Sequence, residues 1–158
     1  MTTTRHRAER QQLNPDLGVL ASQLLFSLQD ELFSRLAEDG YDDLLPRHGS
    51  VLAWLDEDGI RATELARLSG RHKQIVGRIV DELETLGYVE RRPDPQDRRA
   101  KLIFPTERGL DQTRRGDEIV ADIEARYARA LGGRTYAAFR DVLRQVVASE
   151  REQIAERT

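Results

Sequence analysis

The sequence of 158 residues contains no cysteine, and this absence excludes disulfides, thiolate-bound zinc and redox sensing through a thiol. The lack of cysteine fits a cytoplasmic protein, and we expect this location. Glycine and proline are scarce, at 11 and 5 residues, while 34% of the chain is charged, which is typical of a folded helical protein. The length predicts one domain. No apolar run approaches the roughly 18–20 residues that cross a bilayer, so we expect neither a membrane span nor a signal peptide.

Motifs for catalysis and metal binding are missing as well. The histidines His6, His48 and His72 do not share metal-ligand spacing. No glycine-rich phosphate loop or nucleophile motif is present, and the acidic cluster at residues 56–58 has no partner nearby for acid–base chemistry. We therefore expect no enzyme activity, no cofactor and no metal. His48 has two interpretations: it lines an effector pocket, or it is a surface or hydrogen-bonded helix histidine.

Apolar residues repeat every three or four positions on both sides of the centre. This spacing predicts a long helix over residues 16–40 and further helices after Thr106, interrupted at Gly132-Gly133. We expect residues 1–15 to be a mobile arm, because no apolar pattern runs through them. The long apolar faces fit an ordinary monomer core or an intertwined dimer, and the dimer would bury more of them.

Short helices and two strands are predicted between the long helices. Pro46 suits a first helical turn, and Thr63 can cap the next helix, which stops at Gly70. Another helix begins near His72 and ends before Gly87. Its buried face is expected to comprise Ile75, Val76, Ile79, Val80 and Leu83. The segments YVERR and KLIF that follow are rich in strand formers. Two short helices and a two-stranded ribbon outline a winged helix-turn-helix.

The loop between these strands is basic and stiff. Residues 91–102, RRPDPQDRRAKL, contain five basic residues, two acids and two prolines. Pro93 and Pro95 fix φ, and Asp94 and Asp97 suit turn positions. We expect one of the two acids, Asp97 by preference, to pair with a neighbouring arginine and hold the hairpin. The remaining arginines can then reach a minor groove or phosphates.

The second short helix has a polar outward face that suits DNA. Opposite its apolar positions, helical spacing places Lys73, Gln74, Gly77, Arg78 and Asp81. Glutamine pairs with adenine, and lysine or arginine with guanine, in the major groove. Residues 67–101 carry nine basic against six acidic residues, or +3, although the whole chain carries −3. Local positive charge still attracts phosphates, because charges beyond a Debye length of about 8 Å are screened. An ordinary solvated surface is the other interpretation.

Residues 62–109 read ATELARLSGRHKQIVGRIVDELETLGYVERRPDPQDRRAKLIFPTERG. In their wing, Asp97 and Arg99 are followed by Thr106 and Gly109. This segment resembles the MarR family of transcription regulators, whose wing carries an Asp-x-Arg and a Thr-x-x-Gly. The resemblance implies a mainly α fold with a small β-wing: a winged helix-turn-helix of about six helices.

The resemblance also implies a homodimer built from one domain, residues 1–158. Its helices in 16–45 and 107–158 would form the dimerisation unit, and residues 46–106 the DNA-binding lobe. The recognition helix would be 72–86.

Two departures from the family pattern affect this lobe. Pro105 replaces an aliphatic residue and is expected to shorten the second wing strand. His72 replaces the usual Ser or Thr cap of the recognition helix.

The predicted function is sequence-specific binding of double-stranded DNA by a homodimeric transcription repressor. The resemblance implies a palindromic operator and a small-molecule effector, aromatic or phenolic, that relieves repression. DNA contacts are expected from Arg71, His72, Lys73, Gln74, Gly77, Arg78, Arg98, Arg99 and Lys101. Asp97 is expected to support the wing, and Arg99 to enter a minor groove. The alternative is a helical dimer whose winged lobe docks a protein.

Overall fold

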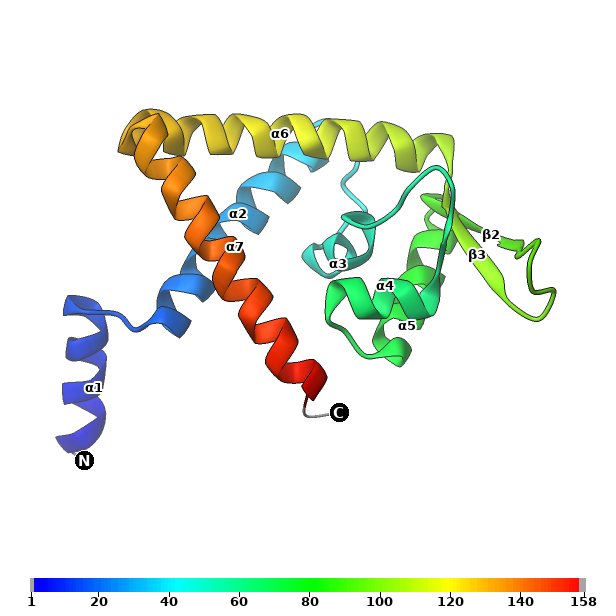
Figure 1. Ribbon diagram of the computed structural model, residues 1–158. Coiled ribbons are helices and arrows are strands. Elements are labelled where there is room, and N and C mark those ends of the chain that lie inside the picture. Colours follow the sequence, from blue (N-terminus) through cyan, green and yellow to red (C-terminus); the bar gives the residue numbers. More distant parts are fainter. Residues whose placement is uncertain (1, 157–158) are drawn as a thin grey trace. The chain divides into compact units, whose positions relative to one another are not determined.

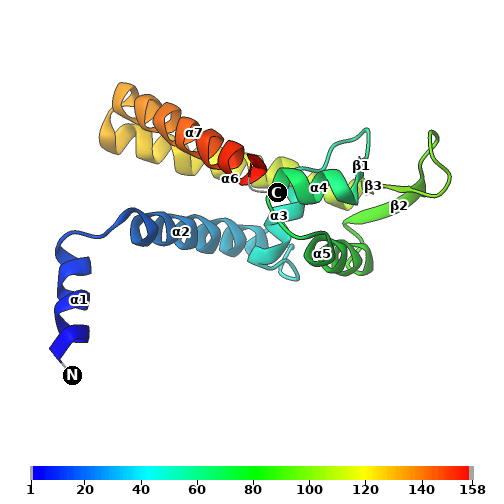
Figure 2. The same cartoon turned by 60° about the horizontal axis from the view of Figure 1, so that its bottom comes forward.

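The computed structural model of the protein describes residues 2–156 and, among them, the side chains of residues 6–153. The chain forms two compact units, one ending at Asp117 and the other beginning at Glu118. Figure 1 and Figure 2 show the helices and the small sheet in two views. Across residues 2–156, no helix combines the length and the apolar character that a membrane span requires.

Helices dominate the described part of the chain. In chain order the elements are α1 (Thr2–Leu13), α2 (Leu17–Glu38), the 3-10 helix η1 (Pro46–His48), α3 (Gly49–Leu52), β1 (Ile60–Arg61), α4 (Ala62–Ser69), α5 (Lys73–Thr85), β2 (Val89–Pro93), β3 (Lys101–Pro105), α6 (Glu107–Leu131) and α7 (Gly133–Glu156). This order confirms the predicted fold class, a mainly α chain with a small β-wing.

The N-terminal segment differs from the expectation. We predicted an arm over residues 1–15, whereas the backbone of Thr2–Leu13 is helical. Asp16 joins this helix to the next one. Its carboxylate accepts hydrogen bonds from Gln11 Nε2 (2.6 Å) and from the backbone N–H of Val19 (3.0 Å), so it caps α2. Periodicity missed α1 because the helix has no apolar stripe.

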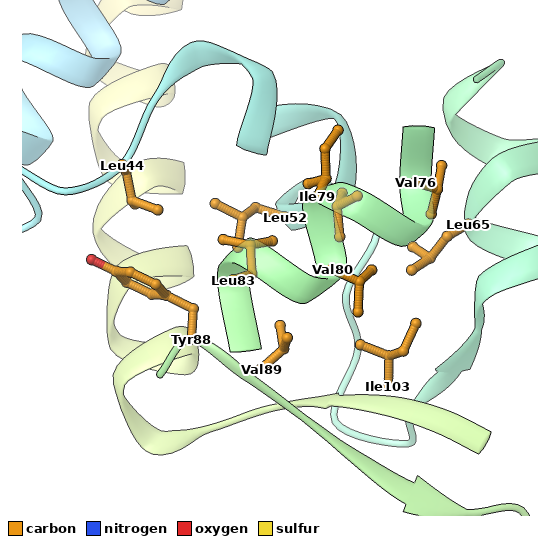
Figure 3. Close-up of a cluster of buried hydrophobic side chains, with 11 residues drawn as sticks. Leu44, Leu52, Leu65, Val76, Ile79, Val80, Leu83, Tyr88, Val89 and Ile103 are labelled. Atoms are coloured by element: carbon orange, nitrogen blue, oxygen red, sulfur yellow. The ribbon is translucent and has the colours of Figure 1, made fainter. Parts of the chain in front are cut away.

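The core of the first unit is packed beneath α5 (Figure 3). As predicted, Val76, Ile79, Val80 and Leu83 are buried, and they recur at helical spacing on one face. Fully burying each such side chain is worth about 1.5–3 kcal/mol relative to leaving it exposed. They pack with Leu44, Val51, Leu52, Leu65, Tyr88, Val89 and Ile103. Ile75 does not extend this face, since it is 41% exposed.

The sheet has three strands in the order β1–β3–β2, all antiparallel. The sequence predicts β2 and β3 but not the two-residue β1, which pairs Ile60 with Ile103. The expectation that Pro105 shortens the second wing strand is wrong, because β3 runs through Pro105, which pairs with Val89. Proline is tolerated there because it is the last residue of the strand.

The start of α4 also differs from the prediction. The helix begins at Ala62, so Thr63 lies inside it, and Arg61 is the N-cap without a side-chain cap bond. Strand β1 fixes Arg61 in an extended conformation, and the helix follows at once. The predicted stop is confirmed, since Gly70 adopts a left-handed conformation at φ 65°.

Thr106 and Gly109 join the wing to α6. The Thr106 hydroxyl donates to the carbonyl of Gly87 (2.6 Å) and accepts from the backbone N–H of Gly109 (3.1 Å), as an N-cap does. A Cβ at Gly109 would lie 2.1 Å from the carbonyl oxygen of Tyr88. The Thr-x-x-Gly pattern is therefore a cap followed by a close approach between α6 and Tyr88, the residue before β2.

Tyr88 links the junction between the wing and α6 to the loop that follows α2. Its buried hydroxyl donates to Asp43 Oδ1 (2.5 Å), and the Arg108 guanidinium lies 4.3 Å from its ring centroid. Burial, with the Asp43 carboxylate second, raises the pKa of Tyr88 well above its ordinary value. The hydroxyl stays protonated and keeps this hydrogen bond.

Candidate nucleic-acid interface

The N-terminal half of α5 presents the side chains predicted to read bases. Lys73, Gln74 and Arg78 are exposed. Gly77 is half-buried, and no atom lies within 4 Å of where its Cβ would be. His72 is the N-cap, but its side chain makes no cap hydrogen bond, so the imidazole stays exposed. The structure brings these residues to one open helix surface.

Cations of the lobe fall into two groups. Arg67, Arg91 and Arg92 form ion pairs with acids of the same lobe. Within residues 6–153, the other six basic side chains between 67 and 101 make no ion pair or hydrogen bond; they are Arg71, Lys73, Arg78, Arg98, Arg99 and Lys101. All six are exposed. These unneutralised cations are the basic residues that the sequence predicts to contact DNA.

The wing loop is held by two aspartates with different roles. Asp97 accepts a hydrogen bond from the backbone N–H of Arg99 (3.0 Å), but the pairing with an arginine side chain that we expected of it belongs to Asp94. Asp94 is 4% exposed and pairs with Arg61 of β1. Asp97 cannot take this place because it lies at the exposed end of the loop.

Arg91 connects α5 to β2. Its guanidinium pairs with Asp81 (2.6 Å) and with Glu84, both on α5, and its backbone N–H donates to Glu84 Oε1 (3.2 Å). Asp81, which was predicted on the outward face, is thereby neutralised. These contacts fix the first wing strand relative to the predicted recognition helix.

Comparison with known proteins identifies the lobe. The profile of the MarR family matches residues 42–100. Over 107 residues the chain is 30% identical to the transcriptional repressor MprA of Escherichia coli K12, a match that covers 65% of this chain and 61% of MprA. Over this lobe the chain is similar to the MarR family. This confirms the predicted resemblance, and MarR-family proteins are transcription regulators rather than enzymes.

Solved structures of the family resemble most of the chain. The transcriptional repressor CouR, bound to a 23-mer DNA duplex, is 26% identical with a TM-score of 0.71, covering 87% of this chain and 96% of CouR. CouR from Rhodococcus jostii RHA1, bound to p-coumaroyl-CoA, is 29% identical with a TM-score of 0.69, covering 85% and 93%.

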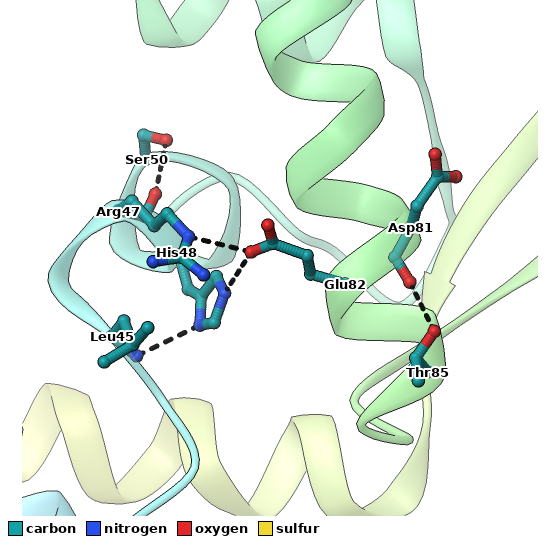
Figure 4. Close-up of polar contacts among 7 residues, drawn as sticks. All are labelled: Leu45, Arg47, His48, Ser50, Asp81, Glu82 and Thr85. Atoms are coloured by element: carbon teal, nitrogen blue, oxygen red, sulfur yellow. Dashed lines mark hydrogen bonds and ion pairs between the residues drawn. The ribbon is translucent and has the colours of Figure 1, made fainter.

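A polar cluster between η1 and α5 was not predicted. His48 and Arg47 of η1 converge on Glu82 of α5 (Figure 4), at 2.9 Å for His48 Nε2 and 2.8 Å for Arg47 Nε. The His48 Nδ1 accepts from the Leu45 N–H (3.1 Å), which leaves Nε2 as the nitrogen that donates to Glu82. The Arg47 guanidinium and then His48 hold the pKa of Glu82 below its ordinary value.

The position of His48 answers the question raised by the sequence. It is 1% exposed with both ring nitrogens hydrogen-bonded, so it is a satisfied histidine. It also lines an open cavity of about 430 Å³. Sequence reasoning missed Glu82 as its partner because the two residues are 34 positions apart. Across residues 6–153, no group of three or more acidic or histidine side chains is arranged to hold a metal ion.

Proposed function

We propose that the protein is a sequence-specific DNA-binding transcription regulator, a repressor that binds a palindromic operator as a homodimer. One observation carries this proposal: the six unneutralised cations gather on the start of α5 and on the wing, while the other basic residues between 67 and 101 are paired with acids. Unpaired guanidinium and ammonium groups are the donors that phosphates and base edges need. The DNA-bound structure of CouR supports the same use of this lobe.

The proposed docking places α5 in the major groove. Gln74 and Arg78 would contact base edges, while Arg71 and Lys73 at the start of the helix would contact phosphates. Arg98, Arg99 and Lys101 would reach the adjacent minor groove or backbone from the wing. The imidazole of His72 is free for a further contact because it caps nothing.

Salt dependence tests the proposed function. Each phosphate contact releases counterions, so log affinity should fall linearly with log salt concentration, by about 0.9 per contact. Fluorescence anisotropy with genomic and random duplexes across a salt series measures this slope. If the purified chain binds no duplex in a salt-sensitive way, the proposal fails, and the winged lobe becomes a candidate for protein docking.

Gly77→Ala separates helix stability from DNA binding. Alanine should stabilise α5 by about 1 kcal/mol, because glycine costs that much in a helix interior and the new methyl group meets no atom within 4 Å. Affinity for DNA should fall, because the methyl group occupies the space between helix and groove. Thermal unfolding and anisotropy measure the two effects. Unchanged affinity would show that the backbone at Gly77 does not approach DNA.

Exposed apolar surface supports the homodimer. On α7 a single helical face carries Phe139, Val142, Leu143, Val146 and Val147, each between 42% and 59% exposed. Helix α2 likewise exposes Leu17, Leu20, Leu25 and Phe26 by at least 50%. Contiguous apolar helix faces of this kind mark protein interfaces. A second copy of the chain is the proposed partner, and two-fold symmetry would then present two winged lobes to a palindrome.

Analytical ultracentrifugation should find a species of twice the chain mass of 18.1 kDa. Val142→Ala should raise the dimer dissociation constant about tenfold, because it removes roughly two methylene equivalents from the interface. The control is Arg144→Gln, a substitution of an exposed polar residue on the same helix, which should leave dissociation almost unchanged. A monomer at micromolar concentration would contradict the proposal.

A small-molecule effector completes the proposed function. The p-coumaroyl-CoA bound to CouR supports an aromatic acid derivative as the class of effector. Such a ligand would relieve repression only by binding better to an arrangement of the lobes that fits the operator poorly.

A further inference from the structure

Strand β1 reaches the wing through one ion pair. Arg61 Nε donates to Asp94 Oδ2 (2.7 Å), and its Nη2 donates to the same oxygen. The two residues are 33 positions apart in sequence. The Asp94 side chain is 5% exposed, so this carboxylate depends on its partners to compensate for the water it has lost.

Asp94 also organises the turn that carries the wing arginines. Its other carboxylate oxygen, Oδ1, accepts from the backbone N–H of Gln96 (2.8 Å). Its backbone N–H donates to the carbonyl of Ala100 (3.0 Å), and its own carbonyl accepts from Asp97 (3.3 Å). Arg98 and Arg99 lie inside the loop that these bonds close. The Gln96 N–H and then Arg61 lower the pKa of Asp94, so it is ionised at neutral pH.

Arg61 is itself held in place. It pairs with Leu102 of β3 in the sheet, and it caps α4 as the residue before Ala62. Arg61 is therefore held by β3 and α4 in the body of the lobe, while its partner Asp94 lies in the wing loop. A guanidinium with two N–H groups on one carboxylate oxygen restrains both the position and the direction of that carboxylate.

We propose that Arg61 is a positioning residue for the wing: by holding Asp94 it presets the loop that presents Arg98 and Arg99 to DNA. The inference rests on the proposed DNA-binding function and deepens it. A loop ordered before binding loses less conformational entropy when its arginines meet the duplex. Arg61 is 44% exposed, but its Nε and Nη2 are committed to Asp94, so it acts through the wing and not as a phosphate contact.

Two substitutions test the contact with opposite changes of charge. Arg61→Gln removes a positive charge, and Asp94→Asn removes a negative charge. Simple attraction to a polyanion predicts that the second variant binds DNA more tightly. Positioning predicts that both bind at least about tenfold more weakly, because each loses the charge-assisted hydrogen bonds that hold the loop. The double variant should bind no more weakly than either single one.

The probe is a duplex enriched from a randomised pool by the unmodified chain. Arg67→Gln and Asp58→Asn are the matched controls: they remove the same charges from exposed positions of the lobe and should change affinity less than about threefold. Hydrogen exchange should become faster at the N–H groups of Asp97 and Ala100 in both test variants and stay unchanged in α5.

A third measurement separates positioning from general stability. In a background with Arg98→Ala and Arg99→Ala, Arg61→Gln should have no further effect on affinity, because the loop that Asp94 holds then has no arginine to present to DNA. A further loss in that background, or tighter binding by Asp94→Asn, would overturn the inference. So would full affinity in both test variants. If the unmodified chain itself binds no duplex, the proposed function fails instead.

Discussion

Arg99→Ala is expected to weaken operator binding at least about a hundredfold without changing the fold. The side chain is exposed and makes no ion pair or hydrogen bond within residues 6–153, so its removal leaves nothing unsatisfied in the protein. A charge-assisted contact with DNA is worth about 1.5–3 kcal/mol, and a dimer would lose two of them, one from each wing. Anisotropy with the enriched duplex measures the loss.

Arg114→Ala is the control for this experiment. It removes the same charge from an exposed arginine of α6 that pairs with Asp111, outside the helix-turn-helix and wing. Its effect on affinity should be small, since exposed surface charges act weakly through salt. Circular dichroism and sedimentation should be unchanged for both variants. Equal affinity of Arg99→Ala and the unmodified chain would show that the wing does not contact DNA.

Gly109→Ala is expected to destabilise the protein by about 3 kcal/mol or more. The added Cβ would lie 2.1 Å from the backbone carbonyl oxygen of Tyr88. This Cβ is attached directly to the backbone of α6 and cannot rotate away, so α6 and the segment just before β2 must separate. Separation would also stretch the hydrogen bond from the Thr106 N–H to that carbonyl, now 3.0 Å. Urea unfolding monitored by circular dichroism measures the change.

Gly116→Ala on the same helix is the matched control. A Cβ there would meet only the end of the Gln112 side chain, at 3.4 Å, which is ordinary contact. This substitution should therefore stabilise the helix by up to about 1 kcal/mol. A similar free energy of unfolding for Gly109→Ala and Gly116→Ala would contradict the close approach between α6 and Tyr88.

Much of the lobe could be predicted because its signals are local. The apolar spacing of Val76 to Leu83 defines one buried face of α5. Gly70 ends α4, where a left-handed conformation is needed. The predicted DNA contacts lie on α5 and the wing, at exposed or half-buried positions, as the pattern indicated. Their role in binding DNA stays a prediction.

The errors at β1, α4 and Asp97 arise from pairing between distant segments. Strand β1 is too short to show a pattern, and its pairing with β3 moved the start of α4 ahead of Thr63. Asp94 and Asp97 are equivalent as turn residues in the sequence. Only the position of Arg61, 33 residues earlier, makes Asp94 the buried partner.

The sequence by itself determined the helices after α1, the wing and the basic surface, because hydrophobic period, glycine stops and charge are properties of neighbouring residues. Tertiary structure alone decided which charges are neutralised and which stay free. The guanidinium of Arg91 is bound by two acids of α5, whereas the guanidinium of Arg99 in the same hairpin pairs with no acid among the described residues. That difference arises because an ion pair needs two groups within about 4 Å, and only the fold sets distances between residues far apart in the chain.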